Sequence, residues 1–210
     1  KLANKNEAKL HFTNPNLLDE LWIDKPERKY SSIFDHPKNY AGIDTSNKVY
    51  QFIQELKKSH LDSYFLSSLD SIAWLLNLRG DDILHTPLAF AYLFISVESK
   101  PVLYVCIDKL NTDLKIRLNN FLTLEPIEKI ENIFNNLRKN LKIGFDYKNT
   151  SYFFYNLALK NNHRPSNLQN PCLIPKAIKN DTELKGSRKA HIRDGVSITK
   201  FLCWLKNHQS

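Results

Sequence analysis

Apolar residues spaced three and four positions apart predict the helices of this chain. The pattern is clearest over residues 45–58, where Thr45 or Ser46 is the predicted N-cap. The apolar positions of this helix are Val49, Phe52, Ile53 and Leu56. Asn180 and Glu183 match a capping box, which predicts that a final helix starts there and runs to about residue 206. Further helices are predicted over residues 112–119, 126–138 (with Pro126 in its first turn) and 150–160.

Short continuous apolar runs predict the strands. Residues 88–96 and 101–107 are rich in aliphatic and aromatic side chains, and only residues 97–100 separate them, which predicts a β-hairpin. Residues 63–66 and 142–146 are two further predicted strands. Because helices alternate with strands around one hairpin, the pattern as a whole predicts an α/β domain on a mixed sheet.

The stretch SSLDSIAWLLNLRGDD, residues 67–82, is a dense apolar run with polar residues at both ends. Its apolar centre predicts a buried helix. At the start, Ser67 and Asp70 have the spacing of a capping box. At the end, Arg79 suits the negative pole of the helix dipole, and Gly80 suits the left-handed residue that follows many helices. Capping therefore accounts for these polar residues without any chemistry.

The composition is that of an ordinary globular protein, with 42% apolar and 25% charged residues among 210. No apolar run approaches the roughly 20 residues of a membrane span. The net charge is +8, but the lysines are scattered, so we expect a solvated basic surface rather than a nucleic-acid site. Three distant cysteines, Cys106, Cys172 and Cys203, favour reduced thiols in a cytoplasmic protein. The chain contains no methionine, and we expect it to be a processed or truncated product of a longer protein.

Few residues qualify as candidates for chemistry, and each has a simpler structural interpretation. Asp81 and Asp82 could form a carboxylate pair, but adjacent acids in a loop are usually solvated. His191 and Asp194 are three residues apart on one helix face, yet a metal site needs three or four ligands, so we favour a helix-face hydrogen bond. Acids near the ends of predicted strands would suit a metal nuclease of RNase H-like form, a weaker alternative, and they are Asp62, Asp70, Asp108 and Asp146. The chain has no phosphate loop, nucleophile elbow or HExxH motif, so we assign no catalytic, cofactor-binding or metal-binding residue.

Residues 66–83, LSSLDSIAWLLNLRGDDI, resemble the signature of the middle domain of aminopeptidase P, the Xaa-Pro metallo-aminopeptidases of the creatinase/prolidase family. Residues 171–205, PCLIPKAIKNDTELKGSRKAHIRDGVSITKFLCWL, resemble the entry to the catalytic domain of that family. Upstream, the stretches that resemble its inter-domain lead-in are Leu21-Trp22, Pro26, Ile33-Phe34, His36-Pro37 and Tyr40-Ala41-Gly42. These separate stretches agree in order and spacing, so the resemblance is specific and covers nearly all of residues 17–205.

The resemblance implies a division of the chain into three parts. Residues 1–30 would be the tail of a preceding domain or a linker. Residues 31–172 would form a creatinase-N-like middle domain, a mixed sheet with flanking helices related in form to RNase H. Residues 173–210 would be the first strand and helix of a truncated pita-bread catalytic domain, and cutting that domain there would expose an apolar helix face. The residues of this face are Phe201, Leu202, Trp204 and Leu205.

The resemblance also implies a function for the longer protein. Full-length relatives remove an N-terminal residue that precedes proline, using two divalent metal ions, usually manganese, that activate a hydroxide. Their metal ligands, two aspartates, one histidine and two glutamates, lie beyond the first helix of the catalytic domain, where this chain has ended. We therefore expect this hydrolase fragment to be inactive alone and cytoplasmic, without a membrane or nucleic-acid partner. Peptide would be bound only by the full-length enzyme, which could form a homodimer.

A stand-alone interaction module is the alternative to an enzyme fragment. In that case the basic surface or the exposed final helix would bind an acidic partner or nucleic acid. Metal ligands in a continuation of the chain would favour the enzyme fragment, whereas a natural end of the chain at Ser210 would favour the module.

Overall fold

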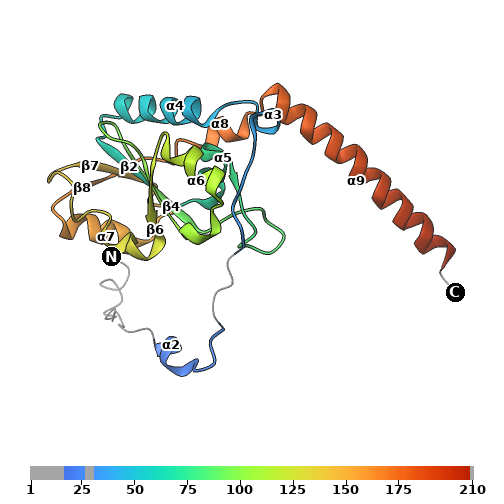
Figure 1. The fold of residues 1–210 in the computed structure, drawn as a ribbon, viewed down its shortest axis with the longest axis horizontal. Helices are drawn as coiled ribbons and strands as arrows, with labels where there is room; N and C mark the ends of the chain where they lie inside the picture. Colours follow the sequence, from blue (N-terminus) through green and yellow to red (C-terminus); the bar gives the residue numbers. More distant parts are fainter. Residues whose placement is uncertain (1–16, 27–30, 209–210) are drawn as a thin grey trace, which may run out of the picture.

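A six-stranded mixed sheet forms the centre of the protein (Figure 1). The structure is a computed structural model that describes residues 17–26 and 31–208. The strands are β2 Ser63–Leu66, β4 Ala91–Ser96, β5 Val102–Val105, β6 Thr123–Pro126, β7 Lys142–Phe145 and β8 Arg164–Asn167. They lie in the order β6-β5-β4-β2-β7-β8, in which β4 is antiparallel to β2 and β5 and the other neighbours are parallel. The predicted hairpin and the strands predicted at 63–66 and 142–146 are confirmed.

Helices cover both faces of this sheet. Their bounds are α4 Thr45–Lys58, α5 Leu69–Leu76, α6 Thr112–Asn119, α7 Tyr152–Lys160 and the 3₁₀ helix η2 Ile127–Asn132. Helices α4, α5 and α6 pack on one face, and α7 and η2 pack on the other. Successive side chains of a strand point to opposite faces, so Tyr64 and Leu66 join the first core whereas Phe65 joins the second. The expected α/β fold with a mixed sheet and flanking helices is confirmed.

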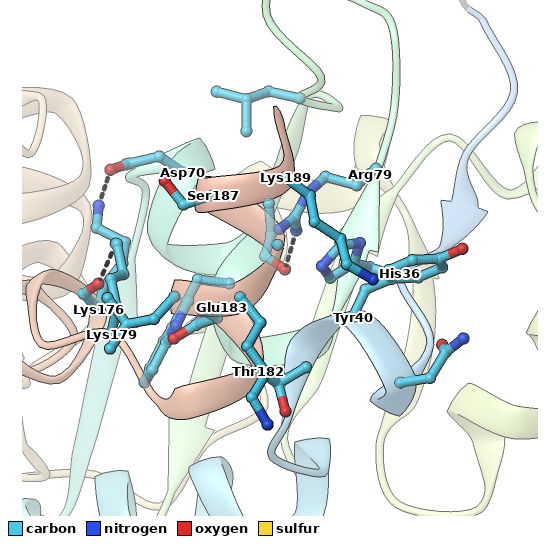
Figure 2. Close-up of a pocket in the computed structure, with 17 residues that line it drawn as sticks. His36, Tyr40, Asp70, Arg79, Lys176, Lys179, Thr182, Glu183, Ser187 and Lys189 are labelled. Carbon is cyan, nitrogen blue, oxygen red and sulfur yellow. Dashed lines mark hydrogen bonds and ion pairs between the residues drawn. The ribbon is translucent and has the colours of Figure 1, made fainter. Parts of the chain in front are cut away.

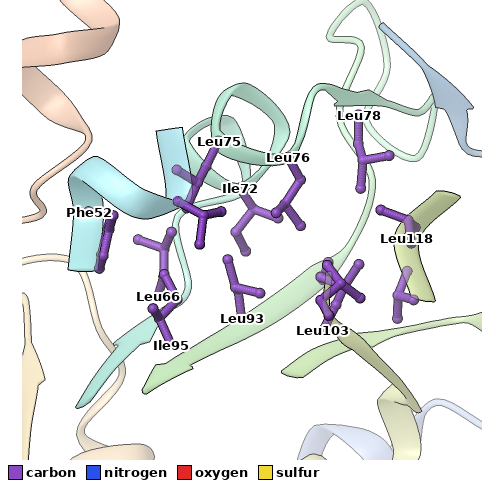
Figure 3. Packing of buried hydrophobic residues seen from close by; sticks show 14 of the residues in the cluster. Phe52, Leu66, Ile72, Leu75, Leu76, Leu78, Leu93, Ile95, Leu103 and Leu118 are labelled. Atoms are coloured by element: carbon purple, nitrogen blue, oxygen red, sulfur yellow. The ribbon is translucent and has the colours of Figure 1, made fainter. Parts of the chain in front are cut away.

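The two cores differ in character. The first is mainly aliphatic, and Figure 3 shows side chains of α5 lying against those of the sheet. Its fully buried members include Leu56, Leu66, Leu75, Leu76, Leu93, Leu103 and Leu118. The second is aromatic, with the Phe65 ring 4.4 Å from that of Phe154 and 5.9 Å from that of Phe145, between ring centroids. Because apolar side chains are buried on both faces of the sheet, the hydrophobic effect stabilises it within a single domain.

Helix α5 begins and ends differently from the prediction. Its N-cap is Ser68, so the predicted capping box of Ser67 and Asp70 is wrong. Its C-cap is Asn77, which has φ of 52° and ψ of 47°, so Arg79 and Gly80 do not end the helix. Asparagine tolerates the left-handed conformation better than most residues, which is why the helix ends here. Arg79 instead belongs to a short strand, β3 (Leu78–Arg79), that pairs antiparallel with β1 (Phe34–Asp35).

Three other local predictions are corrected by the structure. No α-helix forms over residues 126–138, because Pro126 ends strand β6 and only η2 follows it. The N-cap of α4 is Asp44 rather than Thr45 or Ser46, and the Thr45 hydroxyl donates to the carbonyl oxygen of Leu76 at 3.0 Å. The strand expected at the start of residues 173–210 is a helix, α8 (Leu173–Ala177).

A long final helix, α9 (Asp181–Asn207), projects away from the sheet domain (Figure 1). The predicted capping box of Asn180 and Glu183 is confirmed at its start. No residue of α9 is buried, and the predicted exposed apolar face is confirmed. Its members Phe201, Leu202, Trp204 and Leu205 are 56%, 56%, 54% and 38% exposed. The short elements α2 Leu17–Leu21, α3 Lys38–Ala41 and the 3₁₀ helix η1 Ile107–Lys109 complete the described part of the chain.

Candidate functional site

A groove of about 800 Å³ lies where α9 leaves the domain, between α3, α5, β3 and the first turns of α9 (Figure 2). Its apolar wall is formed by Tyr40, Ala73, Trp74, Leu88 and Leu184. Its charged residues are Arg79, Lys176, Lys179, Lys185, Lys189, Asp70 and Glu183. The cations outnumber the two carboxylates, so the groove is basic and suited to a partner of negative charge.

Both carboxylates of the groove are already engaged by neighbouring groups. Asp70, at the start of α5, forms an ion pair with Lys176 of α8. The carboxylate of Glu183 accepts the backbone N–H of Asn180 at 2.9 Å. Lys179 also donates to the carbonyl oxygen of Lys176, at 2.5 Å. These contacts fix the floor of the groove, so Asp70 is a structural ion-pair partner and not a free acid.

His36 and Tyr40 form the edge of the groove next to β1. Their rings stack with centroids 6.0 Å apart. Burial lowers the pKa of His36, and the nearby positive charges of Arg79 and Lys48 lower it further. His36 is therefore biased toward its neutral form at physiological pH.

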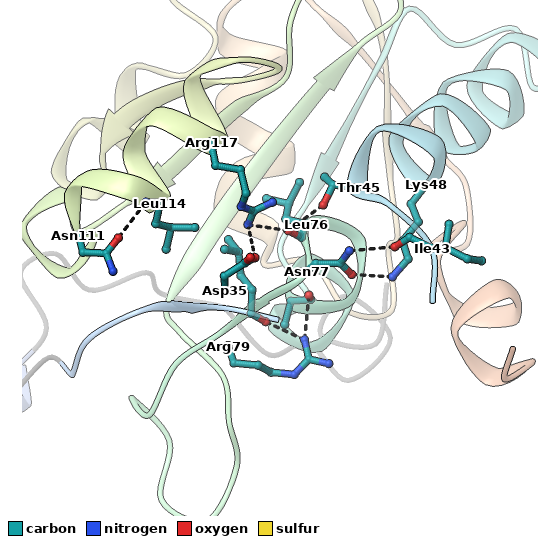
Figure 4. A network of polar contacts seen from close by, with 12 residues as sticks. Asp35, Ile43, Thr45, Lys48, Leu76, Asn77, Arg79, Asn111, Leu114 and Arg117 are labelled. Atoms are coloured by element: carbon teal, nitrogen blue, oxygen red, sulfur yellow. Dashed lines mark hydrogen bonds and ion pairs between the residues drawn. The ribbon is translucent and has the colours of Figure 1, made fainter. Parts of the chain in front are cut away.

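Behind the groove, basic side chains cap the C-terminal end of α5 (Figure 4). The Lys48 ammonium donates to the carbonyl of Trp74 and to Asn77 Oδ1, both at 2.8 Å, and lies 4.3 Å from the Trp74 ring centroid. Arg79 donates to the carbonyl of Ala73 at 3.0 Å, and Arg117 donates to that of Leu76 at 3.4 Å. The last carbonyls of a helix have no partner within the helix and carry negative partial charge, which explains three cations at this end.

Burial has a measurable consequence for the first of these cations. Lys48 is 2% exposed, and burial is the main reason that its pKa falls from 10.5 to about 8. Lys48 is not marked as buried by its residue type, because lysines on a helix are usually solvated. The available signal is its spacing, since it lies four residues before Phe52 on the apolar face of α4.

Asp82 is buried, which corrects the expectation that both Asp81 and Asp82 are solvated. Its side chain is 1% exposed and pairs with Lys109, itself 4% exposed, at 2.5 Å. It also accepts the backbone N–H groups of Ser31 at 3.1 Å and Phe90 at 2.8 Å. Burial raises the pKa of Asp82, but the hydrogen bonds from Lys109, Phe90 and Ser31 outweigh it and hold the pKa below its usual value. This carboxylate is a structural anchor and is shielded from any substrate.

The other candidate acids have separate roles. Asp62 accepts the backbone N–H of Lys142 at 2.7 Å, and Asp108 is exposed. Asp146 is buried and accepts N–H groups of Lys148, Asn149 and Asn170. Within residues 17–26 and 31–208, no group of three or more His, Cys, Asp or Glu residues could hold a metal ion. The arrangement that a metal nuclease requires does not form among these described residues.

His191 and Asp194 do not bind each other on α9. His191 Nδ1 is 2.8 Å from the carbonyl oxygen of Ser187, and Asp194 pairs with Arg193 at 3.8 Å. A helix-face hydrogen bond was predicted for His191, and its partner is the backbone four residues earlier. Both residues are exposed, and among the described residues they belong to no group of three or more candidate metal ligands.

The sequence of residues 24–183 matches the family model of the creatinase/prolidase N-terminal domain. The chain belongs to this family. The match includes the sheet domain, the groove residues up to Glu183 and the first three residues of α9. The resemblance to this family that residues 66–83 carry is thereby confirmed.

Similar proteins extend the comparison. A probable Xaa-Pro aminopeptidase P from Paracoccidioides lutzii is 35% identical over 97% of this chain and 35% of its own length. One from Talaromyces marneffei is 34% identical over 97% of this chain and 32% of its own length. This creatinase/prolidase chain thus spans about a third of the length of these curated relatives. None of these matches supports a stand-alone binding module.

A solved structure resembles nearly the whole chain. The X-prolyl aminopeptidase from Caenorhabditis elegans, described as a cytosolic enzyme with a di-nuclear active site, superposes with a TM-score of 0.89 at 26% identity. The superposition covers 98% of this chain and 34% of the worm enzyme. The described residues of this chain do not fit a di-nuclear metal centre, because they contain no cluster of candidate ligands. No helix among them is long and apolar enough to cross a membrane.

Proposed function

We propose that this chain is a non-catalytic portion of an Xaa-Pro metallo-aminopeptidase. In this proposal residues 31–172 are its creatinase-N-like domain, and residues 173–210 begin its catalytic domain. The superposition on the worm X-prolyl aminopeptidase supports it most strongly, because it continues beyond the sheet domain into α9. The groove, the α5 cap and the Asp82 anchor are then parts of a scaffold that holds the catalytic portion.

The parent reaction in this proposal is removal of an N-terminal residue that precedes proline. Two divalent metal ions, which we propose to be manganese, would supply the activated hydroxide from the catalytic portion. The two-metal part of the proposal is supported by the di-nuclear site of the worm enzyme, and a cytoplasmic location by its description as cytosolic. A homodimer of the longer protein is also part of the proposal. Each of these features belongs to the longer protein.

A chimeric enzyme tests the scaffold function. The matching third of the P. lutzii relative is replaced by this chain, and hydrolysis of an Xaa-Pro peptide is measured with manganese present. We expect the chimera to cleave the peptide and this chain alone to show no turnover. The matched control is the relative with the same third deleted, which we expect to lose most of its activity, since a misplaced catalytic group costs about a hundredfold per ångström.

Two outcomes would overturn the proposal. Turnover by this chain alone, abolished by a chelator, would mean that it contains a catalytic site. A chimera that folds and binds metal as the relative does, yet is inactive, would mean that this domain cannot position that catalytic portion.

A further inference from the structure

The residue that starts α9 also ties this helix to the sheet domain. Asn180 Oδ1 accepts the backbone N–H of Glu183 at 3.0 Å, which caps the helix. Its amide nitrogen donates to the carbonyl oxygen of Ala41, at the end of α3, at 2.9 Å. One side chain therefore makes two contacts, one inside α9 and one 139 residues away in sequence. An aspartate could make the first contact but has no hydrogen to donate to Ala41, and a serine side chain is shorter than asparagine and cannot reach Ala41 while it caps.

Glycine at position 42 leaves the space in which the Asn180 side chain lies. Gly42 has φ of 75°, a conformation that favours glycine. A Cβ atom at this position would lie only 2.7 Å from Asn180 Cγ and 2.8 Å from its amide nitrogen. Any other residue would therefore push the Asn180 side chain away from Ala41. We call Ala41, Gly42 and Asn180 the α9 joint.

A second set of contacts holds the segment just before this joint. Asn170 donates to Ser71 of α5 at 2.8 Å and accepts the backbone N–H of Cys172 at 3.0 Å. Cys172 is 1% exposed, and Lys176 forms its ion pair with Asp70. The chain is thus fixed on α5 before it reaches α3. Because α8 is fixed on α5, α9 can change its direction only by a rotation at its first turn, where the α9 joint lies.

The length of α9 makes this freedom consequential. A helix of 27 residues is about 40 Å long, so a change of about 10° at its base moves its far end by about 7 Å. No residue of α9 is fully buried, and Thr182 and Glu183, which are partly buried, lie in its first turn, so its direction is set at its base, where the joint lies. The superposition on the worm enzyme covers 98% of this chain. It therefore includes α9, although two thirds of that enzyme have no counterpart here.

We propose that the α9 joint is an orienting device: Asn180 and Gly42 fix the direction in which α9 leaves the domain and so position the part of the longer protein that α9 leads into. This inference deepens the proposed function and rests on it only for the identity of that part. Asn180 and Gly42 are positioning residues, since they lie outside any reacting centre. The direction of α9 itself can be measured in the chain alone.

Distances between two spin labels measure that direction. One label is attached to the exposed Cys203 on α9, and the other to Tyr50→Cys on α4, where Tyr50 is 63% exposed. Cys106→Ser removes the half-buried thiol, and the buried Cys172 is left in place. In this background we expect one narrow distance distribution for the parent, and a shifted or broadened one for Asn180→Ser and for Gly42→Ala.

The choice of serine separates capping from docking. In Asn180→Ser the new hydroxyl and Glu183 would still form a capping box, so the helix content from circular dichroism should stay unchanged. The shorter serine side chain cannot reach Ala41 while it caps. The matched control is Asn111→Ser, because Asn111 caps α6 by accepting Leu114 N–H at 2.8 Å. This control should leave the distance distribution unchanged.

The outcomes distinguish orientation from general stability and from the proposed function. The proposal would be overturned if folded Asn180→Ser or Gly42→Ala had the same distribution of label distances as the parent. If one of these variants fails to fold, the label distances in the other test the proposal. In the active chimera, Asn180→Ser should lower kcat/KM by about tenfold to a hundredfold while the thermal midpoint stays near that of Asn111→Ser. If the unmodified chimera is inactive, the proposed function fails while the label distances still test the joint.

Discussion

At the scale of single residues, this domain places charge in its interior and satisfies it with partners distant in sequence. Asp82 pairs with Lys109, 27 residues later, and Lys48 bonds to Asn77, 29 residues later. Neither pair could be predicted from the sequence, because an acid or a lysine has the same local pattern whether it is solvated or buried. Only the three-dimensional position of the partner distinguishes the two.

Breaking the Asp82–Lys109 pair should be costly. Asp82→Asn or Lys109→Met alone removes the counter-ion of a buried charge, so we expect each to lower the free energy of unfolding by about 3–5 kcal/mol. The double variant should recover part of this loss. Urea denaturation measures all three. Glu125→Gln is the control, since its pair with Lys129 is exposed and should contribute less than about 1 kcal/mol.

This effect should also depend on pH. The folded-state pKa of Asp82 is below its usual 3.8, so the carboxylate stabilises the fold above that value and loses its contribution as pH falls through the folded pKa. The difference between the parent and Asp82→Asn should therefore shrink below pH 3.8. A difference that stays constant into strong acid would contradict a stabilising ionised Asp82.

Thiol reactivity provides a second prediction at this scale. Burial raises the pKa of Cys172 to about 12, whereas Cys203 is exposed on α9. At pH 8 only about one Cys172 in ten thousand would be ionised, and the thiolate is the reactive form. We expect iodoacetamide to modify Cys203 rapidly and Cys172 only under denaturing conditions, as measured by peptide mass spectrometry. Equal rates in the native protein would mean that residues 170–177 are not packed on α5.

At the scale of elements, the sequence predicted the interior of the sheet and missed its edges. Strands β2, β4, β5 and β7 are apolar runs, and all were predicted. The edge strands β6 and β8 contain polar residues and Pro126 or Pro165, so no apolar pattern marks them. Proline is tolerated there because an edge strand has one unpaired side. Likewise, α6 was predicted over its full length, whereas the end of α5 depended on tertiary partners of Asn77.

Substitutions at Asn77 test what ends α5. Asn77→Gly keeps the left-handed conformation but loses the bonds to Lys48 and to the carbonyl of Ile43, which should cost about 1–3 kcal/mol. Asn77→Ala should cost about 1 kcal/mol more, because alanine is strained in this conformation. Thermal and urea unfolding measure the stabilities of the parent and of the two variants, which we expect to fall in the order parent, Asn77→Gly, Asn77→Ala. Asn162→Ala is the control that measures only the cost of placing alanine in the left-handed conformation, since Asn162 has φ of 61° and is exposed. If Asn77→Ala equals the parent, the capping network contributes nothing.

At the scale of the whole molecule, the buried cores use only residues between Ile33 and Cys172. The groove could not be predicted, because it forms where α3, α5 and α9 meet, and these are far apart in sequence. The start of α9 could be predicted, because its capping box is local. The apolar face near the end of α9 could also be predicted, because its residues follow a helical spacing. What covers that face could not be predicted. The sheet domain should therefore fold without α9.

Deletion of residues 181–210 tests this independence. The remaining chain keeps both cores, α8 and Asn180, and it loses no buried residue of α9, because α9 has none. We expect a cooperative thermal transition within about 4 °C of the parent, equivalent to roughly 1 kcal/mol in a domain of this size. Sedimentation should also show less self-association, because an exposed apolar helix face has been removed. Deletion of residues 164–210 is the control: it removes strand β8 and the buried Cys172, and should abolish the transition. Loss of the transition in the shorter deletion would mean that α9 stabilises the sheet domain through contacts that its exposed surface does not explain.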